Sequence, residues 1–111
     1  MSTEENKALV RHILLEVNSG NLAIMNDHPG LREALPHVKT MVEARPGTKA
    51  EIAQQLTDGD WVVTRLLLSG VLAKEFMGTP AGTHYVSETI LLYKVVNGKV
   101  VEMHSQAGRV G

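Results

Sequence analysis

Cysteine is absent from this sequence, and that absence excludes disulfide bonds, thiolate nucleophiles and metal sites built on cysteine. A run of about 20 apolar residues, the length that a membrane-spanning helix needs, is also missing. The N-terminal stretch MSTEENKALV opens with acidic residues and has no apolar core of the kind found in secretory signals. Together these absences predict a cytoplasmic protein that does not enter a membrane.

An excess of charge of either sign is lacking as well. The chain has 11 Lys and Arg residues against 12 Asp and Glu residues, which gives a formal net charge of −1. The basic residues are scattered, so no basic stripe is available to bind nucleic acid or an anionic membrane surface. The histidines show no metal-ligand spacing with carboxylates. We therefore expect neither a nucleic-acid partner nor a bound metal.

What is present is the composition of one ordinary globular domain. The chain has 111 residues, of which 43% are hydrophobic and 21% are charged. This length supports one hydrophobic core and leaves no room for a second. The sequence shows no internal repeat, low-complexity tract or linker. A single domain over residues 1–111 is predicted.

The first 20 residues have the pattern of an amphipathic helix. Ser2 and Glu5 have the spacing of a capping box, in which each side chain bonds the backbone of the other residue. Apolar residues then recur every three or four positions between Leu9 and Val17. A helix over residues 3–18 is predicted.

A second helical pattern follows a short turn-rich stretch. Apolar residues are spaced as on a helix from 31 to 42, but Pro36 lies within them. Proline removes a backbone hydrogen bond and clashes with the preceding turn of a helix. The pattern is therefore compatible with a kink at Pro36 or with a helix that begins near Leu35 and ends before Arg45.

The second half of the chain has the composition of β-strands. Four stretches are rich in β-branched and large apolar residues: 49–57, 61–72, 84–96 and 99–107. Asp58-Gly59 and Asn97-Gly98 are typical of two-residue hairpin turns. Two helices followed by two hairpins predict an α+β fold, in which the helices pack on a strongly curved, mainly antiparallel sheet.

The second hairpin turn also predicts which side chains share a face. Opposed residues on antiparallel strands point to the same side of a sheet. With Asn97-Gly98 as the turn, the expected pairs are Tyr93 with Glu102, Leu91 with His104, and Thr89 with Gln106. One face then mixes aromatic and polar groups, as a ligand cavity does. Its predicted ligand contacts are Tyr85, Ser87, Tyr93 and Gln106, with His104 beside them.

The first hairpin contributes two more candidate ligand contacts. With Asp58-Gly59 as the turn, Trp61 lies opposite Leu56 and Arg65 opposite Ile52. Arg65 is flanked by apolar residues on its own face, so its guanidinium either extends to solvent or holds an acidic group inside. Trp61 and Arg65 are both predicted to contact a ligand.

The other face of the second hairpin is more apolar. Its contiguous apolar residues are predicted to be Val86, Ile90, Leu92, Val101 and Met103. A bare patch of this size invites association, and a two-fold axis is the commonest arrangement for small oligomers. We expect a homodimer that uses this face.

Several segments together resemble the SnoaL-like polyketide cyclases and their ester-cyclase relatives, within the nuclear-transport-factor-2-like superfamily. They are Glu5-Asn6-Lys7-Ala8-Leu9-Val10-Arg11, Ser19-Gly20-Asn21-Leu22, Asp58-Gly59-Asp60 with Arg65, Glu75-Phe76-Met77-Gly78-Thr79-Pro80, and Asn97-Gly98-Lys99-Val100-Val101-Glu102. The resemblance implies a cone-shaped α+β barrel with a cavity between sheet and helices, usually as a dimer. It also implies a small apolar or polyketide-like ligand and chemistry without metal or cofactor.

Two features depart from the family pattern. Members usually carry an aspartate that acts as acid and base four residues beyond an aromatic residue of the last strand. Here the resemblance places His104 at the aromatic position and Gly108 at the aspartate position. The stretch 22–27 is also too short for the further helix and strand that members have there.

Three functions are therefore compatible with the sequence. The first is a domain that binds a small apolar molecule. The second is a cofactor-independent cyclase, isomerase or hydrolase in which His104 acts as acid and base. Glu102 lies two residues away on the same strand, roughly 6–7 Å between α-carbons, and would orient His104. The third is a dimeric interaction domain with a vestigial cavity.

Overall fold

The computed structural model describes the backbone of residues 2–109 and the side chains of residues 2–106. The elements in chain order are α1 (Thr3–Asn18), the 3₁₀ helices η1 (Leu22–Asp27) and η2 (Pro29–Leu31), α2 (Leu35–Ala44), β1 (Lys49–Asp58), β2 (Trp61–Val71), β3 (His84–Val96) and β4 (Lys99–Arg109). The strands form one antiparallel sheet in the order β1-β2-β3-β4. The predicted α+β class is confirmed.

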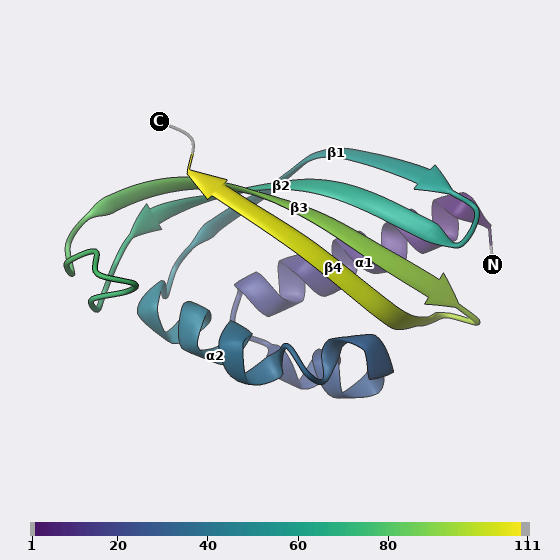
Figure 1. Ribbon diagram of the computed structural model, residues 1–111, viewed down its shortest axis with the longest axis horizontal. Coiled ribbons are helices and arrows are strands. Elements are labelled where there is room, and N and C mark those ends of the chain that lie inside the picture. Colours follow the sequence, from purple (N-terminus) through teal and green to yellow (C-terminus); the bar gives the residue numbers. More distant parts are fainter. Residues whose placement is uncertain (1, 110–111) are drawn as a thin grey trace.

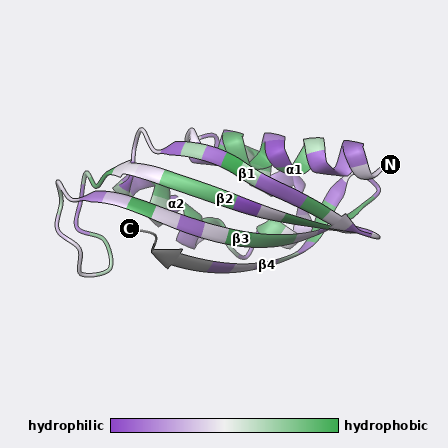
Figure 2. Ribbon diagram, turned by 90° about the horizontal axis from the view of Figure 1, so that it is seen from above, coloured by the Kyte–Doolittle hydropathy of each residue, from purple (hydrophilic) through white to green (hydrophobic). Residues whose placement is uncertain are grey.

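The helices all lie on one side of the sheet, which bends over them (Figure 1). The core between the two layers joins Val10 and Ile13 of α1 to Val62, Val95 and Val100 of the sheet, and these side chains are at most 2% exposed. Hydrophobic and hydrophilic residues alternate along the strands (Figure 2). On β2 this alternation buries the even-numbered residues of 62–68 and leaves the odd-numbered ones partly exposed.

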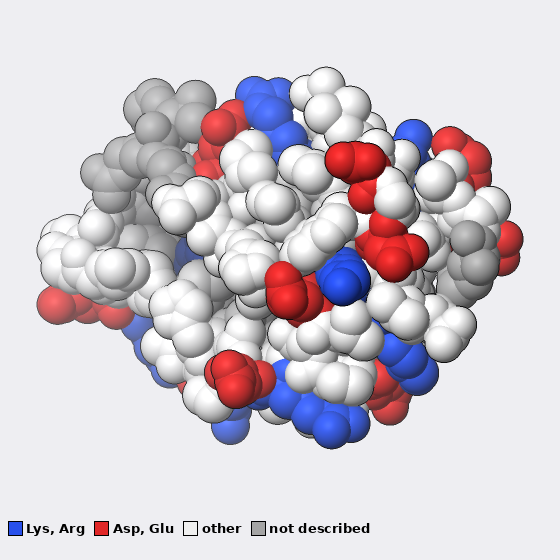
Figure 3. Space-filling view, turned by 45° about the vertical axis from the view of Figure 1, so that its right-hand side comes forward, with Lys and Arg blue, Asp and Glu red and all other residues white. Residues whose placement is uncertain are grey.

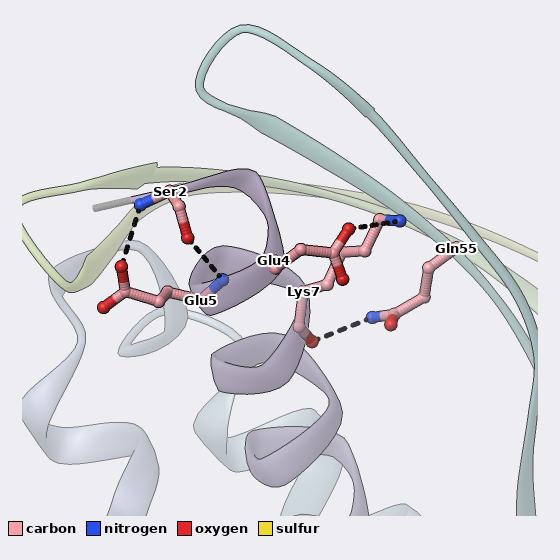
Figure 4. Close-up of polar contacts among 5 residues, drawn as sticks. All are labelled: Ser2, Glu4, Glu5, Lys7 and Gln55. Carbon is pink, nitrogen blue, oxygen red and sulfur yellow. Dashed lines mark hydrogen bonds and ion pairs between the residues drawn. The ribbon is translucent and has the colours of Figure 1, made fainter.

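Helix α1 begins as the sequence predicts (Figure 4). The Ser2 hydroxyl accepts a hydrogen bond from the Glu5 backbone at 3.1 Å, and the Glu5 carboxylate accepts one from the Ser2 backbone at 3.2 Å. This capping box lowers the pKa of Glu5, chiefly through the backbone hydrogen bond from Ser2. The Gln55 amide donates to the Lys7 carbonyl at 3.1 Å and so ties the helix to β1.

The position of Pro36 decides between the two alternatives for the second helix. Helix α2 starts at Leu35, which places Pro36 in the first turn. The first backbone N–H groups of a helix have no partner within it, so proline loses nothing there. The segment from Leu22 to Leu31 forms the two short 3₁₀ helices in place of the longer elements that the family resemblance implies.

A β-bulge changes the predicted pairing of the second hairpin. The Asn97-Gly98 turn forms as predicted, with Val96 opposite Lys99. One step further, Val95 pairs with Val100 and Lys94 with Glu102, so Val101 is an extra residue on β4. A single inserted residue reverses the facing of every residue beyond it. The predicted pairs of Tyr93, Leu91 and Thr89 are therefore wrong by one position.

The first hairpin is also shifted, but Leu56, Trp61 and Arg65 keep their predicted face, whereas Ile52 does not. The turn consists of Gly59 and Asp60, and Asp58 pairs with Trp61. Arg65 lies opposite Gln54, because the register moves by two residues relative to the prediction. A shift of two preserves the facing of each side chain. The register of β1 shifts once more between Ile52 and Gln54. As a result, Ile52 lies on the inner face, opposite Leu66.

The surface carries charges of both signs. Acidic and basic side chains are interspersed among uncharged residues on the face shown in Figure 3. No helix within residues 2–109 combines the length and the apolar character needed to cross a bilayer.

Candidate functional site

A pocket of about 690 Å³ lies between the inner face of the sheet and the helices. Its sheet wall is built by inward-facing residues of β2, β3 and β4, which include Leu66, Leu68, Leu91, Tyr93 and Met103. These residues line the pocket because alternate positions on a strand face the same side. Most of the surface of the pocket as a whole is apolar, which suits an apolar ligand.

The opposite wall comes from three parts of the chain. Helix α1 contributes Leu14 and Val17, and helix α2 contributes Val38, Met41 and Val42. Between β2 and β3, a tight turn with reciprocal backbone hydrogen bonds between Phe76 and Thr79 adds Phe76 and Met77. This turn and the end of α2 lie at the same end of the molecule (Figure 1), where the Ala73 N–H donates to the Ala44 carbonyl at 2.9 Å.

The polar side chains of the pocket come from several elements, and they are Asn18, His37, Arg45, Thr79, Ser87, Thr89, Tyr93 and Ser105. Ser87 and Thr89 of β3 and Ser105 of β4 place hydroxyl groups on the sheet wall. Tyr93 is 5% exposed, and burial raises the pKa of its hydroxyl. The Tyr93 hydroxyl therefore remains protonated near neutral pH and can donate a hydrogen bond. Arg45 is the one residue of the pocket lining with a permanent charge.

Two of the predicted ligand contacts do line this pocket, and a third lies beside it. Ser87 and Tyr93 are part of the sheet wall. Tyr85 is outside the lining, where its hydroxyl shares a short hydrogen bond with Thr48 and its ring lies 5.3 Å from the Arg45 guanidinium. Tyr85 thus contacts the pocket through Arg45.

The bulge places the predicted acid–base pair on the outer face of the sheet. His104 pairs with Leu92 and Glu102 with Lys94, and both side chains are exposed. Glu102 does contact His104 as expected, with 2.9 Å between the carboxylate and Nε2. Gln106 is opposite Ile90 on the same outer face. The prediction that His104 and Gln106 line the cavity is wrong, because the extra residue Val101 turns them away from it.

Trp61 and Arg65 also lie on the outer face and outside the pocket lining. The Trp61 ring lies 6.0 Å from the ring of His104. Arg65 forms an ion pair with Glu88 of the neighbouring strand, with 2.6 Å between Nε and the carboxylate. Arg65 was expected either to extend to solvent or to hold an acidic group inside. It does hold an acid, but this acid is Glu88 of the same chain, and the pair lies outside the pocket.

Met103, Ser105, Arg45 and His37 are among the pocket residues that the sequence reasoning missed. The spacing of Val100 and Met103 was a usable signal for the first two. Strict alternation would bury Glu102 and His104, whereas one extra residue after Val100 buries Met103 instead. Such a three-residue spacing of apolar positions favours a bulge over regular pairing. No comparable local signal marks Arg45.

Metal ligands do not gather anywhere in the part of the chain that the structure describes. No group of three or more His, Asp or Glu side chains lies close enough together to hold an ion. The absence of a bound metal stays a prediction.

Comparisons with known proteins identify the family. The SnoaL-like polyketide cyclase family matches residues 4–111 of this chain. Among curated protein sequences, none is significantly similar.

Solved structures show the same fold. AclR from Streptomyces galilaeus superposes with a TM-score of 0.86 at 22% identity, over 96% of this chain and 77% of that protein. TsrD from Streptomyces laurentii gives 0.82 at 16% identity, over 96% and 90% of the two chains. A SnoaL-like polyketide cyclase from Agrobacterium tumefaciens gives 0.73 at 18% identity, over 97% and 93%. With the family match over nearly all of its residues, this chain belongs to the SnoaL-like polyketide cyclase family.

Proposed function

We propose that this protein binds a small, largely apolar molecule of polyketide-like size in the pocket between sheet and helices. The observation that carries the proposal is a pocket of about 690 Å³ with a mostly apolar surface and polar side chains spread over several elements. Ligand sites of small molecules typically have about 300–1,000 Å³ and this kind of lining. A vestigial cavity would be filled by side chains, so the volume argues against the third function considered above.

Catalysis has less support than binding. No aspartate or glutamate lines the pocket, and the family resemblance places Gly108 where relatives have their aspartate. The acid–base alternative, His104 with Glu102, lies across the sheet from the pocket. That pair would have to act on a molecule bound to the outer face. Apart from the Tyr93 hydroxyl, the remaining acid–base group in the pocket lining is the His37 imidazole, so a cyclase or isomerase reaction there would have to use it.

Filling the pocket tests the binding proposal. Thr89 lies in the middle of the sheet wall, so in the Thr89→Trp variant an indole ring occupies space that a ligand needs. We expect the variant to bind the neutral fluorescent probe N-phenyl-1-naphthylamine at least tenfold more weakly than the unmodified protein. Titration of the probe, followed by its fluorescence, measures the change.

The matched control places the same ring away from the pocket. Gln54 is exposed on β1 and faces the outer side. The Gln54→Trp variant should bind the probe as the unmodified protein does. If both tryptophan variants bind it normally, the probe does not enter this pocket and the proposal fails.

We also propose that the outer face of the sheet forms a homodimer interface. This face carries half-buried or exposed apolar residues on three adjacent strands: Leu56, Val63, Leu67, Val86, Ile90 and Leu92. Met103, which was predicted on this patch, faces the pocket instead. The ion pair of Arg65 with Glu88 lies among the apolar residues. Because both charges are already paired, covering them costs less than burying either one alone.

Replacing Val63 with aspartate tests the dimer, because its cross-strand neighbours Leu56 and Leu92 leave the new charge unpaired, whereas a carboxylate at Ile90 would face Arg65. An unpaired charge in the middle of a buried interface costs several kcal/mol, so we expect sedimentation velocity to show monomers at micromolar concentration. The control is Leu15→Asp, since Leu15 is 44% exposed on α1, on the helix side of the molecule. That variant should remain dimeric. A native chain that sediments as a monomer under the same conditions would contradict the proposal.

A further inference from the structure

Arg45 occupies an unusual position for an arginine that has no acidic partner. It follows the last residue of α2 and lines the pocket. The three ion pairs among the described side chains are Lys7–Glu4, Arg65–Glu88 and His104–Glu102. Within this part of the chain, no carboxylate lies within 4.0 Å of the Arg45 guanidinium. Burial lowers the pKa of Arg45, and the nearby Tyr85 opposes this effect.

Aromatic rings hold the guanidinium in place. Its central carbon lies 5.7 Å from the centre of the Phe76 ring and 5.3 Å from that of Tyr85. Both distances are within the range of a cation–π interaction, about 6 Å. Contact with the face of a ring leaves the N–H groups at the edge of the guanidinium free to donate hydrogen bonds. The charge is thus fixed in position without being neutralised.

The backbone around Arg45 is also well anchored. Its carbonyl accepts hydrogen bonds from the backbone and the hydroxyl of Thr48, at 3.3 and 2.6 Å. The Ala44 carbonyl accepts one from Ala73 in the loop that carries Phe76. An arginine that a ligand uses should be held in advance, because ordering it on binding would cost conformational entropy.

The other residues that line the pocket do not neutralise the charge of Arg45. No acidic residue and no lysine line the pocket, His37 is the other basic side chain of the lining, and most of the pocket surface is apolar. Arg45 and Tyr93 lie toward opposite ends of the pocket. The Arg45 guanidinium contacts Tyr85. From Tyr85 to Tyr93, β3 runs eight residues, roughly 26 Å at 3.3 Å per residue. A ligand along β3 would therefore meet a positive charge at one end, the hydroxyl groups of Ser87 and Thr89 on β3, and apolar side chains of α1 and α2 on the opposite side.

We propose that Arg45 binds an anionic oxygen of the ligand, so that the natural ligand is an apolar molecule with a carboxylate at one end. This inference rests on the proposed binding function and adds the chemical class of the ligand to it. The guanidinium matches a carboxylate through two parallel N–H···O bonds. A lysine at this position would carry the charge but would lose the paired geometry and the stacking on Phe76 and Tyr85.

Two ligands that differ only in their head group test the proposal. Decanoate is ionised near neutral pH, whereas 1-decanol has the same chain and no charge. Each competes with N-phenyl-1-naphthylamine, so the loss of probe fluorescence gives both affinities. We expect decanoate to bind the unmodified protein at least tenfold more tightly than decanol. In Arg45→Met this preference should disappear while the probe and decanol still bind, and Arg45→Lys should retain part of it.

A surface arginine provides the control for Arg45. Arg11 is exposed on α1, so Arg11→Met removes the same charge from the surface and should keep the preference for decanoate. If Arg11→Met lowers decanoate binding as much as Arg45→Met does, the effect is one of net charge and the proposal is overturned. Equal loss of decanoate and decanol in Arg45→Met would show a structural role only. If the neutral probe itself does not bind, the proposed function fails before this inference is reached.

Discussion

Replacing Gly30 with alanine should lower the free energy of unfolding by about 3 kcal/mol. Gly30 lies in η2, which packs directly on the bulge of β4. A Cβ atom at Gly30 would lie 2.5 Å from the Val101 carbonyl carbon and closer still to the Glu102 amide nitrogen. Both neighbours are backbone atoms, so no side chain can rotate to make room, and η2 has to move off the sheet.

The Gly30→Ala substitution should alter the pocket as well as lower the stability. Leu31, next to Gly30, is 1% exposed and lines the pocket. Displacing η2 therefore disturbs one of its walls. Urea unfolding followed by far-UV circular dichroism measures the stability, and titration with N-phenyl-1-naphthylamine measures the pocket.

Gly47→Ala is the control for this substitution. Gly47 has a φ of +75°, and an added Cβ there would meet nothing within 4 Å. The control therefore carries only the backbone strain of a left-handed conformation, about 1 kcal/mol. If the two variants lose the same stability, the close approach of Gly30 to β4 has no energetic importance.

The same contact explains why part of the fold could be predicted and part could not. The features of α1 that made it predictable are local: the capping box of Ser2 with Glu5 and an apolar residue at every third or fourth position. The Asn97-Gly98 turn is equally local, since both residues adopt the positive φ of a tight hairpin, 50° and 75°. Such signals depend on neighbours within four residues and are visible in the sequence.

The bulge at Val101 depends on residues far apart in the chain. It lies against Gly30, about 70 positions earlier, and no periodicity connects the two. Regular pairing from the Asn97-Gly98 turn therefore gave the correct facing for Ser87 and Tyr93 on β3, which has no irregularity against β2. It gave the wrong facing for His104 and Gln106, which follow the bulge.

The position of Arg45 in the pocket is a second feature that could not be predicted from the sequence. The sequence places it at the end of a helix, and the structure confirms that position. Its contacts depend on the loop after β2 folding back to bring Phe76, and on β3 bringing Tyr85, against the guanidinium. Long-range packing of this kind determines which polar residue enters a pocket, whereas local pattern determines only which element carries it.

His28 should make the protein less stable as the pH falls. It is 4% exposed, and its Nδ1 accepts a hydrogen bond from the Val100 backbone at 3.0 Å. The accepting nitrogen carries no proton, so the folded protein holds the neutral ring. Burial, and to a lesser degree the charge of Lys99, lowers the pKa of His28, while Asp27 opposes the shift.

The sign of the pH effect follows from this lowered pKa. The unfolded chain binds a proton at His28 below its ordinary pKa of about 6.5, whereas the folded protein does not until a lower pH. Stability from this group is thus fully present above about 6.5 and is lost as the pH falls toward the folded-state value. The slope can reach about 1.4 kcal/mol per pH unit for one proton.

Two substitutions separate the proton from the packing. His28→Asn retains an acceptor for the Val100 N–H, so it should lose about 2 kcal/mol of stability at neutral pH, and His28→Ala about 3 kcal/mol. In both variants the slope between pH 6.5 and 5 should become shallower by the contribution of one group. His12 is exposed on α1, so His12→Asn should keep the slope of the unmodified protein. Urea unfolding at a series of pH values gives these slopes, and an unchanged slope in His28→Asn would mean that His28 does not control the acid response.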